Sequence, residues 1–177
     1  MNRREAFCVW GFFTVLVFSV VVGMGTLTSG FHLVDDWELA RYTDRMTLEH
    51  ISLWECMKDA MGYDLTLRFR PLYYINRVLA SAVFGINLTA LSIIKAIEIV
   101  IAHVTLYYCA RQMKCGMACA ALFALTVMVG YQSAVWWKLG PQESYAIMMF
   151  AIGFFLLLKW LHGGAKWYAY ASVAFFF

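Results

Sequence analysis

The residues from Phe7 to Leu27, FCVWGFFTVLVFSVVVGMGTL, decide the fold class of this chain. All 21 are uncharged, and an apolar helix of about 20 residues is the length that crosses the ~30 Å hydrocarbon core of a bilayer. A secretory signal peptide has a shorter apolar run, of about 7–15 residues, followed by a small-residue cleavage site. We therefore expect a retained transmembrane span or signal anchor at this position.

Composition extends this expectation to the whole chain. Hydrophobic residues make up 63% of the 177 residues and charged residues only 14%, with a mean hydropathy of +0.67, whereas soluble domains carry about 25% charged residues. Nine of the eleven acidic residues lie in positions 1–64, so the polar material is concentrated early in the chain. The net charge of +3 is small and scattered, which gives no indication of a nucleic-acid partner. The five cysteines lack zinc-ligand spacing and are expected to be small buried apolar residues.

Further apolar stretches define the predicted architecture. We predict an all-α membrane protein with about four to five transmembrane helices, forming one transmembrane domain over residues 1–177. The predicted spans are residues 7–27, 86–110, 116–137, 144–161 and an incomplete 167–177. Because the last stretch has only 11 residues, too few to cross a bilayer, we expect the sequence to be part of a longer chain and the bundle to be incomplete.

Basic residues set the expected topology. With these spans, the pairs Arg3/Arg4, Arg111/Lys114 and Lys159/Lys166 all fall on one side, which the positive-inside rule identifies as the cytoplasm. The N-terminus is then cytoplasmic and the loop 28–85 is outside; the expected location is the bacterial plasma membrane. An alternative topology takes 71–94 as a span and inverts everything downstream, but it places Arg111 and Lys114 outside and is disfavoured for that reason.

The outer loop contains amphipathic patterns. We predict helices over 37–46 and 48–61, and in the second the apolar Leu53, Trp54, Met57 and Met61 recur at helical spacing. Such a helix is suited to the membrane surface. A third helix, over 71–85, is expected to lie half-sunk in the interface and to begin at Pro71.

The adjacent carboxylates of Asp35 and Asp36 are the first chemical candidates. Asp36 is the better N-cap for a helix beginning near Trp37, and a solvated pair is a further structural interpretation. At a membrane face, however, a carboxylate can also act as a general base on an acceptor hydroxyl or hold a divalent cation. The dipeptide alone leaves these alternatives open.

Three motifs in order resemble a known superfamily. The first outer loop carries Val34-Asp35-Asp36-Trp37-Glu38 after an apolar span. Arg68-Phe69-Arg70-Pro71-Leu72-Tyr73-Tyr74 follows, with Phe84-Gly85-Ile86-Asn87 and a long helix closing on Arg111. The third motif is Trp136-Trp137-Lys138-Leu139-Gly140-Pro141-Gln142-Glu143. Together they are similar to the corresponding stretches of polyprenyl-phosphate-sugar-dependent glycosyltransferases of the GT-C superfamily.

The resemblance implies a catalytic aspartate in the first outer loop, acting on a lipid-linked sugar donor. Asp35 and Asp36 are the positions that match as catalytic residues. Candidates for the donor phosphate are Arg68 and Arg70, then Arg41 and Lys138, with contact to lipid headgroups as the alternative. Candidates at the substrate are Glu143 and Trp37, with an interface pair between Glu143 and Lys138 as the alternative for Glu143. The implied partners are a polyprenyl-phosphate sugar and a glycan, lipid or protein acceptor in a bilayer. A divalent cation, Mg or Mn, is a possible cofactor, with its ligands unknown.

Three polar residues within a predicted span are interpreted as structural. Lys95 and Glu98 are three residues apart and are expected to pair inside the bundle, and His103 is expected to form a hydrogen bond there. The rival to an enzyme is a non-enzymatic membrane subunit that associates with another polytopic protein. A transporter is disfavoured because the first and third predicted spans carry no charge.

Overall fold

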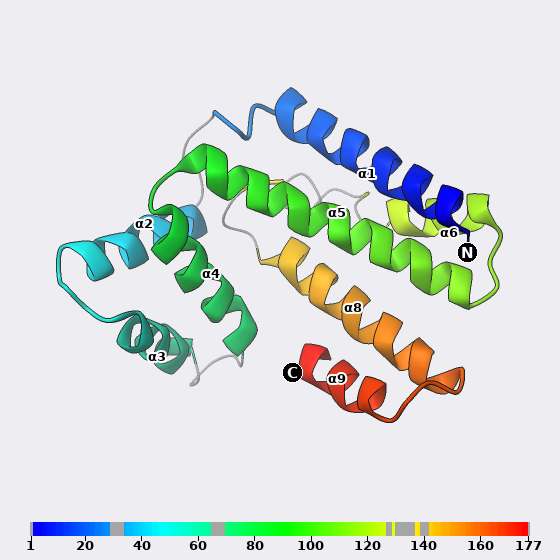
Figure 1. The fold of residues 1–177 in the computed structure, drawn as a ribbon. Coiled ribbons are helices and arrows are strands. Elements are labelled where there is room, and N and C mark those ends of the chain that lie inside the picture. Colours follow the sequence, from blue (N-terminus) through cyan, green and yellow to red (C-terminus); the bar gives the residue numbers. More distant parts are fainter. Residues whose placement is uncertain are drawn as a thin grey trace.

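A computed structural model describes residues 2–28, 34–64, 70–126, 129, 137–138 and 142–176. Every regular element within these ranges is an α-helix (Figure 1). The helices are α1 (Arg3–Gly23), α2 (Val34–Thr47), α3 (Leu53–Asp64), α4 (Pro71–Phe84), α5 (Leu88–Gln112), α6 (Met117–Thr126), α8 (Glu143–Leu161) and α9 (Trp167–Phe176). The predicted all-helical class is confirmed.

Among the described residues, three helices are long and apolar enough to cross a membrane: α1, α5 and α8. They correspond to the first, second and fourth predicted spans and are consistent with a membrane protein. For the predicted span over 116–137, the described part is mainly α6, which has ten residues; most of 127–136 lies outside the described residues. The last predicted stretch forms α9, also ten residues long.

The long helix α5 is the centre of the bundle. It packs against α1, α6 and α8, and α9 packs along α8 (Figure 1). Phe13 and Val17 of α1 and Ile99 of α5 are at most 1% exposed. Alanines on three neighbouring helices complete this core and allow close packing: Ala96, Ala120, Ala124 and Ala151.

A break at Gly85 separates α4 from α5. Gly85 has a φ of +58°, a left-handed conformation that glycine adopts without a Cβ clash. Asn87 then caps α5, because its side-chain oxygen accepts a hydrogen bond from the Ala90 amide at 3.1 Å. The alternative in which 71–94 forms one continuous spanning helix is therefore wrong.

Glycines also shape the reversal between α8 and α9. Gly163 has a φ of +88°, and a Cβ on Gly164 would lie 2.5 Å from the carbonyl oxygen of Lys159. Near the middle of α8, away from the turn, a Cβ on Gly153 would lie 3.2 Å from the Cβ of Phe175. The two helices therefore pack closely because small residues leave room between them.

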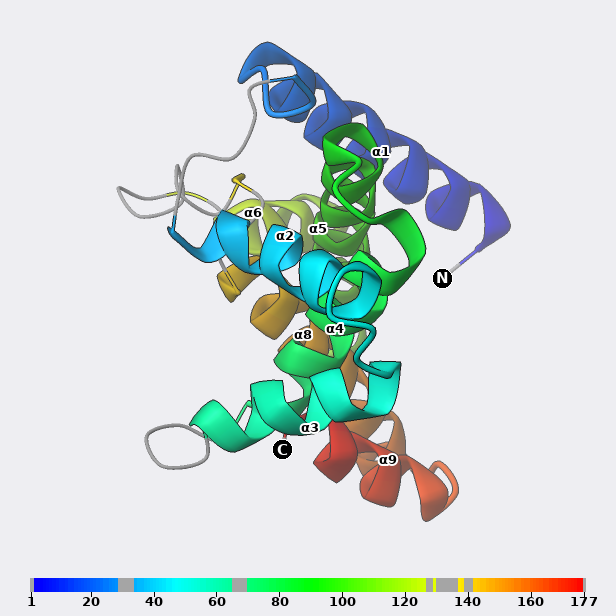
Figure 2. The ribbon, with the colours of Figure 1, turned by 90° about the vertical axis from the view of Figure 1, so that its left-hand side faces the viewer.

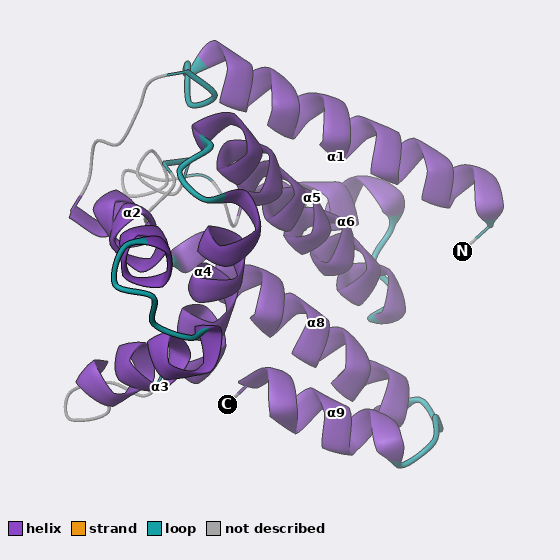
Figure 3. Ribbon diagram, turned by 60° about the vertical axis from the view of Figure 1, so that its left-hand side comes forward, coloured by secondary structure: helices purple, strands orange, loops and turns teal. Residues whose placement is uncertain are grey.

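Helices α2, α3 and α4 form a separate group beside the end of the bundle where α5 and α8 begin (Figures 1, 2 and 3). Their core contains Tyr42, Cys56, Met57, Ala60, Tyr73, Tyr74 and Val78. Met57, predicted to lie on the membrane surface, is thus buried and Met61 packs beside it, whereas Leu53 and Trp54 are 40% and 70% exposed. The prediction for this helix was wrong for the two methionines, because α4 takes the place assigned to lipid.

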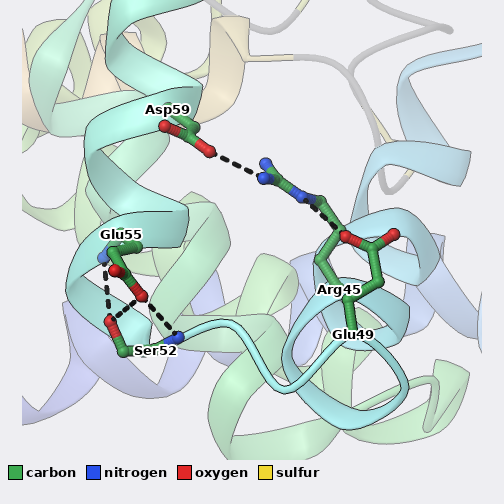
Figure 4. Close-up of polar contacts among 5 residues, drawn as sticks. All are labelled: Arg45, Glu49, Ser52, Glu55 and Asp59. Carbon is green, nitrogen blue, oxygen red and sulfur yellow. Dashed lines mark hydrogen bonds and ion pairs between the residues drawn. The ribbon is translucent and has the colours of Figure 1, made fainter.

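The helix boundaries in this group also differ from prediction. Helix α2 begins at Val34 rather than Trp37, and α3 begins at Leu53 rather than Leu48. Ser52 explains the later start: its hydroxyl accepts a hydrogen bond from the Glu55 amide at 3.3 Å, and the Glu55 carboxylate accepts one from the Ser52 amide at 3.2 Å (Figure 4). This reciprocal pair is a capping box.

Arg45 ties α2 to α3. Its Nη2 lies 2.6 Å from Oδ2 of Asp59, and its Nε lies 3.6 Å from Oε2 of Glu49 (Figure 4). The hydrogen bond to Asp59 raises the pKa of Arg45. Since Asp59 is 55% exposed, this pair fixes the geometry of the two helices more than it adds stability.

The other end of the bundle joins α1 to α5. The Glu5 carboxylate accepts hydrogen bonds from Arg111 at 2.7 Å and from the Tyr107 hydroxyl at 2.8 Å. The α1 N-terminus, the α5–α6 turn and the α8–α9 turn lie together at this end, away from α2–α4 (Figure 1). The basic residues predicted to share one side, from Arg3 to Lys166, belong to the helix ends and turns that lie together here. The orientation of the protein in a membrane stays a prediction.

Candidate functional site

Four ionisable side chains are buried where α2, α4 and α5 meet. Asp36 is 1% exposed, Arg77 5%, Lys95 6% and Glu98 8%. Burying a charge costs several kcal/mol unless it is paired and hydrogen-bonded. We name these four residues, with Glu38 and Asn76, the inner charged cluster.

The contacts within the inner charged cluster join three helices. Asn76 Nδ2 of α4 donates a hydrogen bond to Glu98 Oε1 of α5 at 2.8 Å. Arg77 of α4 lies 3.4 Å from the Glu38 carboxylate of α2. The Lys95 ammonium interacts electrostatically with the carboxylates of Glu98 and Asp36. Helices α2 and α4 are therefore attached to the long helix α5 through polar and charged groups.

A small cavity of about 40 Å³ adjoins the inner charged cluster. Its polar wall comes from Asn76, Arg77, Lys95 and Glu98, and its remaining wall from apolar and aromatic side chains. The volume suits one or two water molecules or a single hydroxyl-bearing group. The cavity can therefore hold one small polar group but is too small for a whole substrate.

A larger groove of about 370 Å³, which we name the Arg70 groove, lies between the N-termini of α4 and α8 and the end of α9. Arg70 and Glu143 supply its charges. Its apolar lining includes Pro71, Leu72, Ala146, Met149, Phe150, Phe175 and Phe176. The groove therefore pairs a cation with an apolar channel.

Arg70 is held at the groove by contacts on several sides. It donates hydrogen bonds to Gln142 and, at 3.1 Å, to the Tyr74 hydroxyl. Its guanidinium also lies 5.3 Å from the ring centroid of Tyr73. Tyr73 and Tyr145 line both the groove and the small cavity, so these two tyrosines are the wall between them.

The structure distributes the predicted site residues over several places. Arg70 and Glu143 share the Arg70 groove, and Glu143 is exposed as the first residue of α8. Asp36 belongs to the inner charged cluster. Because α2 begins at Val34, Asp36 lies inside the first helical turn, so its assignment as N-cap was wrong. Lys138 is half-buried in a short described segment.

Two predicted residues line a different, open cleft. Trp37 and Arg41 are exposed and face a space of about 780 Å³ between α2, α3 and α4. Its charged walls include Asp44, Arg45 and Asp59. Tyr42 also lines it, and burial raises the pKa of its phenol, with Glu38 adding to the effect. Tyr42 therefore stays protonated at neutral pH.

Two predicted positions cannot be compared with the fold. Arg68 and the side chain of Asp35 lie outside the described residues. The described residues include no group of three or more His, Cys, Asp or Glu side chains placed to hold a metal ion.

Sequence reasoning missed Asn76, Arg77 and Tyr145. Asn76 and Arg77 lie in the middle of an otherwise apolar helix, and a buried arginine at such a position signals an internal partner. No local signal marks Tyr145, since its position depends on how α8 packs against α4 and α5. Lys95, Glu98 and His103 were correctly predicted to be internal, and His103 is hydrogen-bonded to the Ile99 carbonyl at 2.8 Å.

No family model matches this chain, and no curated protein or solved structure matches it either.

Proposed function

We propose that the chain is an integral membrane glycosyltransferase, or part of one, that uses a polyprenyl-phosphate sugar as donor. The observation that carries the proposal is the Arg70 groove of about 370 Å³, in which the Arg70 guanidinium and the Glu143 carboxylate lie beside a mainly apolar lining. A polyprenyl phosphate has the same division, with an anionic head on an isoprenoid chain. The proposal also draws on the resemblance of the sequence motifs.

The donor phosphate is assigned to Arg70. A guanidinium forms bidentate, charge-assisted hydrogen bonds with phosphate oxygens. Tyr73, Tyr74 and Gln142 already fix its position, so little ordering is needed on binding. The first isoprene units would then lie along the apolar residues contributed by α8 and α9.

The sugar is assigned to the side of the groove that faces the inner charged cluster. Tyr73 and Tyr145 separate the two spaces, and tyrosine rings with hydroxyl groups suit a sugar that is apolar on its faces and polar at its edges. Glu143, exposed at the mouth of the groove, can accept hydrogen bonds from sugar or acceptor hydroxyls.

The transfer step needs a base and a stabilised leaving group. A carboxylate removes the proton from the acceptor hydroxyl as its oxygen attacks the anomeric carbon, and the bond from that carbon to the phosphate oxygen breaks. The polyprenyl phosphate leaves with the electron pair, and Arg70 stabilises its charge. We assign the base to Asp35, because Asp36 is buried and its carboxylate lies near Lys95. Asp36 is then a positioning residue.

The membrane arrangement follows the same proposal. Helices α1, α5 and α8 span the bilayer, α2–α4 lie at the outer face, and the basic end containing Arg111 and Lys159 is cytoplasmic. The donor is therefore bound from the outer leaflet. The bacterial plasma membrane is the proposed location.

The experiment uses membranes from cells that express the protein as its gene encodes it. Polyprenyl phosphates carrying different radiolabelled hexoses are added, and label is followed from the lipid fraction into acceptor material. At least one donor should lose its sugar in a protein-dependent manner. The absence of protein-dependent transfer with every donor, at matched expression, would favour the non-enzymatic membrane subunit.

A further inference from the structure

A second groove lies at the opposite end of the bundle, between the last turns of α5 and α8. It has a volume of about 320 Å³ and is lined by Tyr108, Arg111, Gln112, Phe155 and Lys159. None of these residues takes part in the proposed transfer. We name it the Lys159 groove.

The groove combines an apolar wall with positive charge. The rings of Tyr108 and Phe155 have centroids 6.4 Å apart, and the Lys159 ammonium lies 5.5 Å from the Phe155 ring centroid. Arg111 is already paired with Glu5 at 2.7 Å and with the Cys115 carbonyl at 2.6 Å. Lys159 adds a second positive charge to the groove, beside the Phe155 ring.

A polar atom in the same place lacks a partner. The Gln112 side-chain nitrogen is buried and has no hydrogen-bond partner among the residues that the structure describes. Leaving such a donor unsatisfied costs about 1–3 kcal/mol. Basic residues in a last helical turn are explained in part by the helix dipole, but that explanation does not extend to the Gln112 amide.

The surroundings favour an anion at a membrane surface. The same end of the bundle carries Arg3, Arg4, Lys114 and Lys166, and Glu5 is the only acidic residue in the sequence of the segments 2–10, 106–117 and 158–168. Clusters of basic residues beside membrane spans attract anionic lipids, each contributing about 1 kcal/mol. Aromatic rings beside them suit the upper part of an acyl chain.

We propose that the Lys159 groove binds the headgroup of an anionic phospholipid. Lys159 and the Gln112 amide contact the phosphate, and Tyr108 and Phe155 contact the glycerol and the first acyl carbons. The proposal depends on the membrane placement proposed above but not on the transfer activity. A lipid in this position would tie α5 to α8 at the end opposite the donor groove.

The experiment measures lipid retention. Protein extracted from membranes in detergent is incubated with equal amounts of phosphatidylglycerol and phosphatidylcholine, and retained lipid is counted by native mass spectrometry. Wild type should retain phosphatidylglycerol preferentially. Lys159→Gln should reduce that preference about fivefold, and Gln112→Leu should reduce the retention of both lipids, since both carry the phosphate that the Gln112 amide contacts. Lys166→Gln, which removes a charge at the same end outside the groove, should reduce the preference less than Lys159→Gln does.

Each contrary result has a distinct meaning. Equal retention by Lys159→Gln and Lys166→Gln would overturn the site, as would displacement of phosphatidylglycerol by inorganic phosphate at equal concentration. Failure of the protein to sediment with membranes before extraction would instead contradict the membrane placement on which the proposed function also rests.

Discussion

The Asn76 amide donates a hydrogen bond to the Glu98 carboxylate at 2.8 Å, and this contact joins α4 to α5 beside Lys95. It links a helix of the α2–α4 group to the central helix of the bundle. Because both helices also line the cavity next to the Arg70 groove, the geometry of the candidate site depends on this contact.

Glu98→Gln should destabilise the protein by about 3 kcal/mol, because it removes the carboxylate that attracts the buried Lys95 ammonium most strongly. Thermal unfolding in detergent measures the effect. The double variant Lys95→Met with Glu98→Gln should regain much of the lost stability, since the buried ammonium is removed as well. A double variant less stable than the single one would contradict this interpretation.

Arg70→Gln should raise the KM for the lipid donor at least tenfold, because the guanidinium contacts the donor phosphate in both ground and transition states. The KM is measured by steady-state kinetics with a short-chain polyprenyl-phosphate sugar as donor. Lys58→Gln, on the exposed face of α3, is the matched control. An unchanged KM in Arg70→Gln would remove Arg70 from the donor site.

Protonation of Glu55 should weaken the start of α3. Hydrogen bonds from Ser52 hold the pKa of Glu55 below its ordinary value of 4.5. The stabilisation is therefore present above pH 4.5 and is lost as the pH falls through the lower, folded-state pKa. Hydrogen exchange at residues 53–56, corrected for its intrinsic pH dependence, should show protection at pH 6 that declines below pH 4. Glu55→Gln should remove this pH dependence, and an unchanged profile in that variant would contradict the assignment.

Gly153→Val should separate α8 from α9, because a side chain there meets Phe175 and the Ser172 carbonyl at 3.2–3.3 Å from its Cβ alone. Overpacking of this kind destabilises by roughly 2 kcal/mol, measurable as a lower thermal midpoint in detergent. Gly11→Val in α1 is the control, since nothing lies within 4 Å of its added Cβ. Equal midpoints for the two variants would show that α8 and α9 do not pack as described.

The positions of the long helices were predicted well from the sequence. The boundaries and contacts of α2 and α3 were predicted less well. Uncharged runs such as 7–27 identify a spanning helix from local composition alone, and Pro71 correctly marked the start of α4. The helix over 48–61 was misjudged because its apolar positions suit a lipid surface and a protein surface equally. Only the tertiary position of α4 distinguishes the two.

The candidate site was predictable where one residue carries a strong local signal. Arg70 and Glu143 were named from motifs, but their meeting in one groove depends on the packing of α4 against α8 and α9. The inner charged cluster was partly expected from Lys95 and Glu98. Its link to Asp36 and Arg77 required the fold, because the four buried charged residues come from three separate helices.

The rate of sugar transfer by the Asp35→Asn variant, compared with that of the wild type, is the most direct test of the proposed activity. Membranes containing equal amounts of wild type and variant are supplied with the active donor, and transfer is measured. We predict a loss of at least 100-fold, the contribution of a general base, with expression and membrane insertion near normal. Unchanged transfer in Asp35→Asn would contradict the assignment of Asp35 as the general base.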